Sequence, residues 1–114
     1  MRATGDAFER RACAELTRAG LILLSRNYAT RHGEIDLVMR DGACIVFVEV
    51  RYRRNATHGS GLESITPSKR HRLILAARQW LANHPPYATH ACRFDVVGYT
   101  HASVQWLKNA FESV

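Results

Sequence analysis

Two acidic side chains lie within the most apolar segments of the sequence. Asp36 belongs to residues 35–40 and Glu49 to residues 43–53, and both segments are rich in Val, Ile and Phe. Two carboxylates about 4 Å apart repel each other by about 4 kcal/mol at an effective dielectric constant of about 20, so a folded chain must compensate such a pair. A divalent cation does so, because Mg²⁺ binds one or two carboxylates together with water and phosphate oxygens. A metal site is therefore one interpretation of these acids.

The spacing of the two segments predicts that the acids share one face of a β-hairpin. Residues 41–42 are Asp-Gly, which is typical of a two-residue hairpin loop. With this loop, Asp36 lies opposite Phe47 and diagonal to Glu49, at a backbone separation of about 7–8 Å. Side chains alternate between the two faces of a strand, so Arg51 is expected on the same face as both acids.

A second interpretation of the acids needs no metal. Glu34 shares the predicted face, so Glu34, Asp36 and Arg51 are also compatible with a structural ion-pair cluster at the end of the sheet. A three-residue loop would reverse the alternation and separate the acids. The spacing leaves both interpretations open.

A third acid, Glu9, belongs to the first predicted helix. Residues 6–19 have helical periodicity, and Gly20 is suited to end the helix. The predicted apolar stripe consists of Phe8, Ala12, Leu16 and Ala19. Glu9 lies beside this stripe, so it is expected at the rim of the core or pointing into it, where it can supply a further oxygen to a cation.

The remaining elements predict a mixed α/β fold within a single domain, residues 1–114. Residues 21–26 suit a strand, and residues 92–99 and 104–107 suit a final hairpin. A helix is expected from Pro67 to about Asn83, with Thr66 as its N-cap. The order of helix, strand, hairpin, helix and strands indicates a mixed sheet with helices packed on it. Within it, Asp95 is expected to be structural, and Trp80 and Trp106 to be core residues.

The charge of the chain indicates a polyanionic partner. The formal net charge is +6, and 14 of the 16 cationic residues are Arg, which binds phosphate through two parallel hydrogen bonds. Two basic clusters bracket the predicted site. They comprise Arg51, Arg53 and Arg54 in the first cluster, and Lys69, Arg70 and Arg72 in the second. If both clusters face one groove, they form a track for a nucleic-acid backbone.

Other classes of protein are not supported. The longest apolar stretches, residues 21–24 and 44–48, are far shorter than the roughly 20 residues of a membrane span, so no membrane contact is expected. The N-terminal residues lack the apolar segment of a secretory signal. Three cysteines without a C-x-x-C motif indicate neither a disulfide framework nor a zinc site. A cytoplasmic location is the resulting expectation.

Residues 33–37 (GEIDL) and 46–51 (VFVEVR) resemble the core of the PD-(D/E)xK nuclease superfamily and, within it, the YraN-type family of small bacterial proteins. The resemblance continues through the first helix, where Glu9 and Gly20 match, and through residues 65–69 at the start of the second helix. It also covers the C-terminal strands at residues 93–97 and 106–111, and so nearly the whole chain.

This resemblance implies a restriction-endonuclease-like fold, similar to that of Holliday-junction resolvases, with Glu9, Asp36 and Glu49 as ligands of Mg²⁺ or Mn²⁺. Arg51 occupies the position of the usual catalytic lysine. Since arginine does not lose its proton in proteins, Arg51 is expected to bind the scissile phosphate rather than to act as a base. Lys69 is a candidate to supply an ammonium group in its place.

The functional expectation is a metal-dependent phosphodiesterase that acts on branched or distorted DNA, with RNA as another possible nucleic acid. By analogy with the resolvases, the resemblance also implies a homodimer. Two alternatives remain open. The first is a non-catalytic nucleic-acid-binding module of the same fold, and the second is a small protein-interaction or assembly factor.

Overall fold

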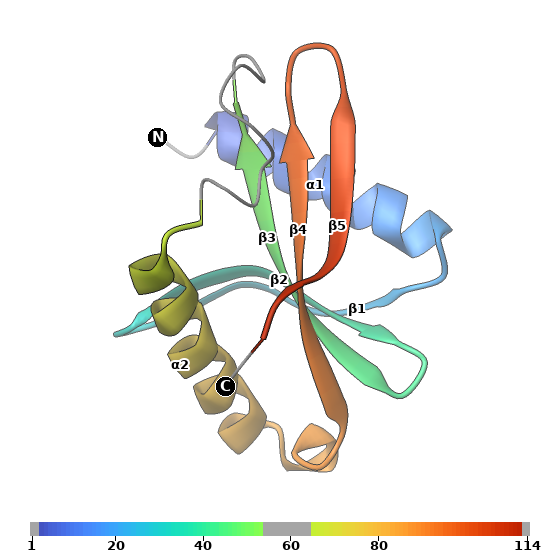
Figure 1. Ribbon diagram of the computed structural model, residues 1–114. Helices are drawn as coiled ribbons and strands as arrows, with labels where there is room; N and C mark the ends of the chain where they lie inside the picture. Colours follow the sequence, from blue (N-terminus) through green and yellow to red (C-terminus); the bar gives the residue numbers. More distant parts are fainter. Residues whose placement is uncertain (1–2, 54–64, 113–114) are drawn as a thin grey trace.

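A five-stranded sheet with one helix on each side forms the framework of the computed structural model, which describes residues 3–53 and 65–112 (Figure 1). In chain order, the elements are α1 (Ala3–Arg18), β1 (Ile22–Thr30), β2 (Gly33–Asp41), β3 (Cys44–Tyr52), α2 (Pro67–Asn83), the short 3-10 helix η2 (Pro85–Tyr87), β4 (Ala91–Tyr99) and β5 (Val104–Phe111). No helix in the described part of the chain has the length and apolar character that crossing a membrane requires.

The strands lie side by side in the order of the sequence, β1-β2-β3-β4-β5. All neighbours are antiparallel except β3 and β4, which are parallel. Parallel neighbours need a long crossover connection, and α2 lies on this one. The predicted mixed α/β fold class is therefore confirmed.

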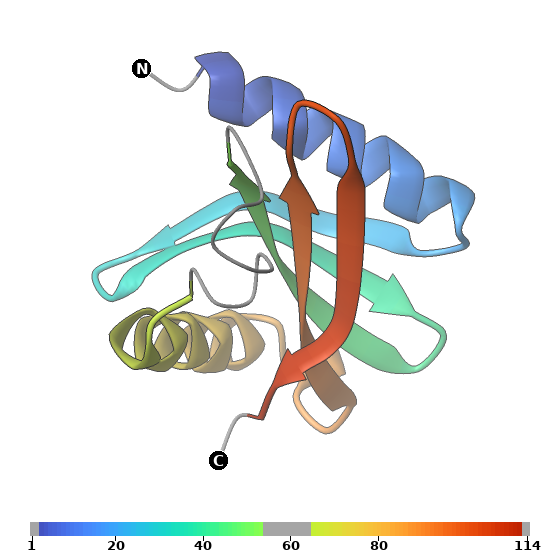
Figure 2. The ribbon, with the colours of Figure 1, turned by 45° about the horizontal axis from the view of Figure 1, so that its top comes forward.

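Each face of the sheet has its own apolar core, as the separation of α1 and α2 by the sheet suggests (Figure 2). The core beneath α1 contains Ala12, Leu16, Leu21, Leu37, Met39, Val46, Val48, Val97 and Tyr99. The core beneath α2 includes Val38, Ile45, Phe47, Leu73, Ala76, Ala77, Trp80, Phe94 and Val96. Consecutive residues of β3 thus serve opposite cores, which explains why this strand is apolar throughout rather than alternating.

The end of α1 follows the predicted signal. Gly20 has a φ of 105°, a conformation that glycine adopts without a steric penalty. The N–H of Leu21 donates to the carbonyl of Leu16, and the N–H of Gly20 donates to Thr17, which is the pattern of a Schellman cap. Ala19 was expected in the apolar stripe but is exposed, because the chain leaves the helix at this point.

The start of α2 is also as predicted. The Thr66 side chain accepts a hydrogen bond from the backbone N–H of Lys69 at 3.1 Å, and Pro67 occupies the first turn. This N-cap has a consequence for the site, since it holds the first turn of α2, and therefore Lys69, in a defined position.

The predicted register of the central hairpin is wrong by two residues. The turn consists of Gly42 and Ala43 rather than residues 41–42, and Asp41 pairs with Cys44. Gly42 has a φ of 60°, which suits the first central position of a type II′ turn. Asp41 stays in the strand, where its Oδ2 accepts a hydrogen bond of 2.9 Å from Arg93 Nη1. A shift of two residues preserves the alternation of faces.

Asp95 joins β4 to β5, as its expected structural role requires. It is 1% exposed, and its carboxylate accepts hydrogen bonds from the Arg93 guanidinium, Trp106 Nε1 at 2.9 Å and the backbone N–H of Asn109 at 2.9 Å. The strand pairing is irregular at this point, and Asn109 has a φ of 51°. The Asp95 carboxylate therefore provides the hydrogen-bond acceptor for the Asn109 N–H at the irregular part of the β4–β5 pairing. Trp80 is fully buried as expected, whereas Trp106 is only partly buried.

We predict that Asp95→Ala lowers the free energy of unfolding by about 3–5 kcal/mol, because it leaves the Arg93 guanidinium and two further donors without their buried acceptor. Urea denaturation measures this change. Glu112→Ala, at an exposed position directly after β5, is the control, with an expected change below about 0.5 kcal/mol. A loss below about 1 kcal/mol for Asp95→Ala would contradict the structural role.

Candidate functional site

The strands β2 and β3 separate at the point where the acidic residues begin. Their last paired residues are Leu37 and Val48, although both strands continue. Beyond that pair, β2 stays bonded to β1 through Ile35 and its neighbours, while β3 stays bonded to β4 as far as Tyr52. The sheet therefore forks between β2 and β3, and the next residues along the two strands are Asp36 and Glu49.

The Asp36 side chain accepts a hydrogen bond from a backbone N–H of β3 beyond the point where β2 and β3 stop pairing. Its Oδ2 accepts a hydrogen bond of 2.8 Å from the backbone N–H of Val50. The same carboxyl group is hydrogen bonded to the side chain of Glu49. Burial, followed by the negative charge of Glu49, raises the pKa of Asp36 from 3.8 to about 7. The buried Asp36 carboxyl group therefore binds a proton more readily than an exposed aspartate does.

Two cations face Glu49 from different elements. Arg51 Nη1 and Lys69 Nζ each lie 3.3 Å from Glu49 Oε2. The Glu49 side chain is 6% exposed, whereas those of Arg51 and Lys69 are 31% exposed. The pocket therefore has a carboxylate at its base and cations toward the solvent. The two residues predicted to act on the phosphate, Arg51 and Lys69, lie together beside one predicted metal ligand.

Both faces of the sheet contribute to this pocket, which has a volume of about 300 Å³. It is lined by Gly5, Phe8, Glu9, Glu34, Asp36, Glu49, Val50, Arg51, Tyr52 and Lys69. The fork explains this composition, because α1 and α2 otherwise lie on opposite sides of the sheet. The structure thus brings all five residues predicted as metal-binding or catalytic to one pocket.

Glu9 is buried, with 5% of its surface exposed, and it reaches the pocket from the α1 side. Among residues 3–53 and 65–112, no three His, Cys, Asp or Glu side chains are grouped so that they could hold a metal ion as they stand. Asp36 and Glu49 are thus in contact, and Glu9 shares their pocket without completing a three-acid group. The role of Glu9 as a ligand stays a prediction.

The chemistry of these donors fits a hard divalent cation. Asp36 and Glu49 present carboxylate oxygens, and Mg²⁺ is commonly held by one or two carboxylates plus water and substrate oxygens. The raised pKa of Asp36 reflects a site that favours positive charge beside Glu49, which a cation supplies as well as a proton does. The pocket has further acidic oxygens in Glu9 and Glu34 and enough volume for water and a phosphate group.

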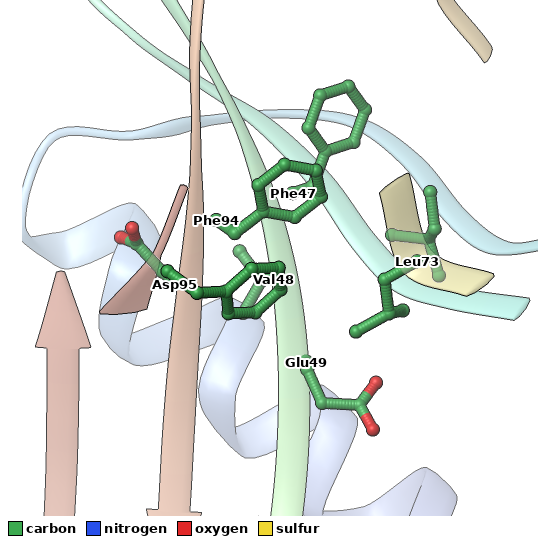
Figure 3. Close-up of a pocket in the computed structure, with 8 residues that line it drawn as sticks. Phe47, Val48, Glu49, Leu73, Phe94 and Asp95 are labelled. Atoms are coloured by element: carbon green, nitrogen blue, oxygen red, sulfur yellow. The ribbon is translucent and has the colours of Figure 1, made fainter. Parts of the chain in front are cut away.

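Asp95 does not belong to this site. The Asp95 and Glu49 carboxylates point away from each other, with the apolar side chains of Phe94 and Leu73 nearby (Figure 3). The Asp95 carboxylate already accepts hydrogen bonds from Arg93, Trp106 and Asn109, so these protein groups compensate its buried charge.

The residues predicted to bind nucleic acid lie in different surroundings. Arg72 is exposed on α2, with its Cβ close to Gly33 at the turn between β1 and β2. Arg53 is partly buried, and its backbone N–H donates to Tyr99. Arg54 lies outside the described residues.

Arg70 is placed differently from Lys69, although the two are adjacent in the sequence. Its Nε donates to the carbonyl of Ile65 at 3.1 Å, and its guanidinium lies 5.7 Å from the centre of the Phe111 ring. Arg70 lines a second pocket, between α2 and the end of β5. The two basic clusters therefore do not form one continuous set around the acids.

Five residues that line the pocket were not predicted as site residues from the sequence: Gly5, Phe8, Glu34, Val50 and Tyr52. Phe8 was expected only in the apolar stripe of α1, although it directly precedes Glu9. Glu34 was considered only for an ion-pair cluster, yet its charge also raises the pKa of Asp36. The Val50 N–H carries no sequence signal, because its role depends on where the strand pairing stops.

The fold and the site together define a small mixed α/β protein with a carboxylate pair and two cations in a fork of its sheet. This chain belongs to the uncharacterised protein family UPF0102, whose model matches residues 8–99. The expected YraN-type family is thereby confirmed.

Relatives in this family cover nearly the whole chain. A UPF0102 protein of Yersinia pseudotuberculosis is 52% identical over 113 residues, which covers 98% of this chain and 97% of the relative. A UPF0102 protein of Klebsiella pneumoniae is 51% identical over 109 residues, which covers 95% of this chain and 85% of the relative.

We predict that Asp36 makes the stability of the protein fall as the pH rises. Between about pH 4 and pH 7, the folded protein keeps a proton on Asp36 that the unfolded chain releases, so raising the pH favours unfolding. The shift from 3.8 to about 7 corresponds to at most about 4 kcal/mol. Urea denaturation of wild type and Asp36→Asn between about pH 4 and pH 8 should show wild type losing stability relative to the variant. A constant difference between the two across this range would contradict the raised pKa of Asp36.

Proposed function

We propose that this protein is a nuclease-type, nucleic-acid-binding protein that hydrolyses phosphodiester bonds in branched or distorted DNA with Mg²⁺ or Mn²⁺. The observation that carries the proposal is the contact between Asp36 and Glu49 in the fork, with Arg51 and Lys69 both 3.3 Å from Glu49. Paired carboxylates with adjacent cations suit a reaction in which a divalent metal and a phosphate occupy one pocket.

The fold gives further support. A helix before a β-hairpin, followed by a crossover helix and two more strands, is compatible with the restriction-endonuclease-like core that the resemblance implies. Within it, the acids occupy the hairpin strands and Glu9 the preceding helix, as in the motif of that superfamily. We extend the assignment of fold and ligands to this chain on that basis.

Each residue of the pocket has a defined task in this proposal. When bound, Mg²⁺ or Mn²⁺ supplies positive charge to the phosphate oxygens and makes water a stronger nucleophile. Asp36 and Glu49, with Glu9 as a third candidate, provide the carboxylate oxygens that hold the cation. Asp36 must release its proton before it can do so.

The cations act on the substrate. Arg51 contributes a guanidinium group, which binds the phosphate and stabilises the charge that develops there. Lys69 presents an ammonium group from α2 beside the same Glu49 carboxylate, and the Thr66 cap holds the turn that carries it. In the superfamily, a lysine usually stands where this chain has Arg51. Lys69 is thus the candidate to supply the charge of that lysine.

A polyanionic partner agrees with the net charge of +6. We assign the exposed Arg72, together with Arg53 and Arg54, to contacts with the nucleic-acid backbone. Arg70 is the weakest member of this group, since its guanidinium already contacts Ile65 and Phe111. We further propose that the protein is a homodimer and that it acts in the cytoplasm.

A second candidate is a non-catalytic nucleic-acid-binding module of the same fold. The arginine at position 51 favours it, because the usual lysine is replaced by a side chain that cannot transfer a proton. Metal binding separates this candidate from a nuclease.

We predict that Mn²⁺ binds to one site per chain and that Asp36→Asn abolishes this binding, because an amide supplies one neutral oxygen where two carboxylate oxygens were available. Isothermal titration calorimetry measures the binding heat. Asp41→Asn is the matched control, since Asp41 lies at the other end of β2 and is paired with Arg93. Equal, flat titrations for wild type and Asp36→Asn would rule out the metal-dependent enzyme.

We also predict that binding to branched DNA depends steeply on salt. With about six phosphate contacts, the affinity should fall roughly 10³-fold between about 50 and 200 mM monovalent salt. Fluorescence anisotropy of a labelled four-way junction measures this dependence. If neither DNA nor RNA binds at low salt, a protein-interaction or assembly factor becomes the better description.

A further inference from the structure

The Phe8 ring contacts two tyrosine rings beside the acidic pocket. The Phe8 ring is stacked on Tyr52, with centroids 4.6 Å apart and an interplanar angle of 18°. Its centroid also lies 5.1 Å from that of Tyr99, at 36°. Phe8 and Tyr52 both line the pocket that contains Asp36 and Glu49.

Phe8 and Tyr99 are firmly held. Tyr52 and Tyr99 are register partners in the parallel pair of β3 and β4, and Phe8 of α1 contacts both of their rings. Tyr99 is 1% exposed, and its hydroxyl donates a hydrogen bond of 3.2 Å to Glu15. The guanidinium of Arg11 lies 4.7 Å from the Tyr99 ring centre.

The Tyr52 ring is the solvent-exposed member of the group. Tyr52 is 43% exposed, although it is a large side chain next to a well-packed core. The other large, exposed apolar side chains of the described chain are aliphatic and lie on the edge strands, at Ile22, Leu23 and Val104. Tyr52 is therefore an exposed ring whose orientation is set by Phe8 and which adjoins charged groups suited to phosphate.

We propose that Tyr52, supported by Phe8, stacks on an unpaired base, so that the pocket takes unpaired nucleotides in preference to fully paired duplex. The inference rests on the proposed nucleic-acid function and specifies its substrate class. Flat, rigid rings are the side chains on which proteins stack bases of single strands. In a continuous duplex, the faces of each base are covered by its neighbours, so only an unpaired or displaced base can reach the ring.

The pocket can hold the rest of such a nucleotide. Arg51 directly precedes Tyr52 in β3, so alternation directs their side chains to opposite faces of the strand. Both nevertheless line the pocket, because the fork opens it to both faces. A base on Tyr52 can thus be combined with a phosphate at Arg51 and Lys69. This arrangement explains why α1 contributes both an aromatic residue, Phe8, and an acid, Glu9, to the same pocket.

Two fluorescein-labelled DNA probes of the same sequence test the inference, one a single strand of about 12 nucleotides and the other a blunt duplex. Anisotropy titrations in EDTA make the result independent of cleavage. We expect wild type to bind the single strand more tightly. Tyr52→Leu should weaken binding to the single strand about tenfold and to the duplex by less than about twofold, because one stacked base is lost.

Two further variants distinguish stacking from other effects. Tyr52→Phe keeps the ring and should bind the single strand within about twofold of wild type. Arg72→Ala should weaken both probes and reduce the salt dependence, whereas Tyr52→Leu should leave the salt dependence unchanged. Circular dichroism and the thermal midpoint verify that each variant is folded.

The inference is overturned if Tyr52→Leu leaves single-strand affinity unchanged or weakens both probes equally. In either case, binding to DNA survives in wild type and the proposed function stands. If wild type binds neither probe at low salt, the proposed function itself fails, and the inference fails with it.

Discussion

Asp36 and Glu49 are held against each other at the point where two paired strands part. In the described structure, their repulsion is offset by the hydrogen bond from the Val50 N–H and by the cations of Arg51 and Lys69, and the pKa of Asp36 is raised. Each compensating group depends on the fork, because continued pairing of β2 with β3 would occupy the Val50 N–H and close the space between the strands. Burying two adjacent carboxylates opposes folding, and in the proposed function a divalent cation and a phosphate would use both kinds of charge.

The two helices convert this local arrangement into a pocket. Since each helix packs on its own core, neither can approach the other except where the sheet opens. There α1 contributes Phe8 and Glu9, while the capped first turn of α2 contributes Lys69. The pocket therefore carries acids at its base and cations nearer the solvent, and the proposed metal and phosphate sites rest on this arrangement. The exposed ring of Tyr52 adds a flat surface beside these charges.

Local signals in the sequence were sufficient for some features of the molecule and not for others. The Schellman glycine at Gly20 and the Thr66 cap depend on neighbouring residues only, so both could be predicted. The approach of Asp36 to Glu49 was predictable as well, but its geometry was not, because Ile35 packs in the same core as Val38 and alternation along β2 is therefore interrupted beside Asp36. The register was not predictable either, since it depends on the turn beginning at Gly42 and on a contact of Asp41 with Arg93, 52 residues away. Likewise, the end of the β2–β3 pairing depends on tertiary packing.

A crystal structure of the protein grown with Mn²⁺, with anomalous data recorded, tests the central claim most directly. We expect an anomalous peak between the carboxylates of Asp36 and Glu49, at about 2.0–2.2 Å from an oxygen of each, and we expect the hydrogen bond between these groups to be lost. Glu9 can also turn toward the same ion. A peak at another place, or carboxylates that remain hydrogen bonded to each other at saturating Mn²⁺, would contradict the proposed metal site.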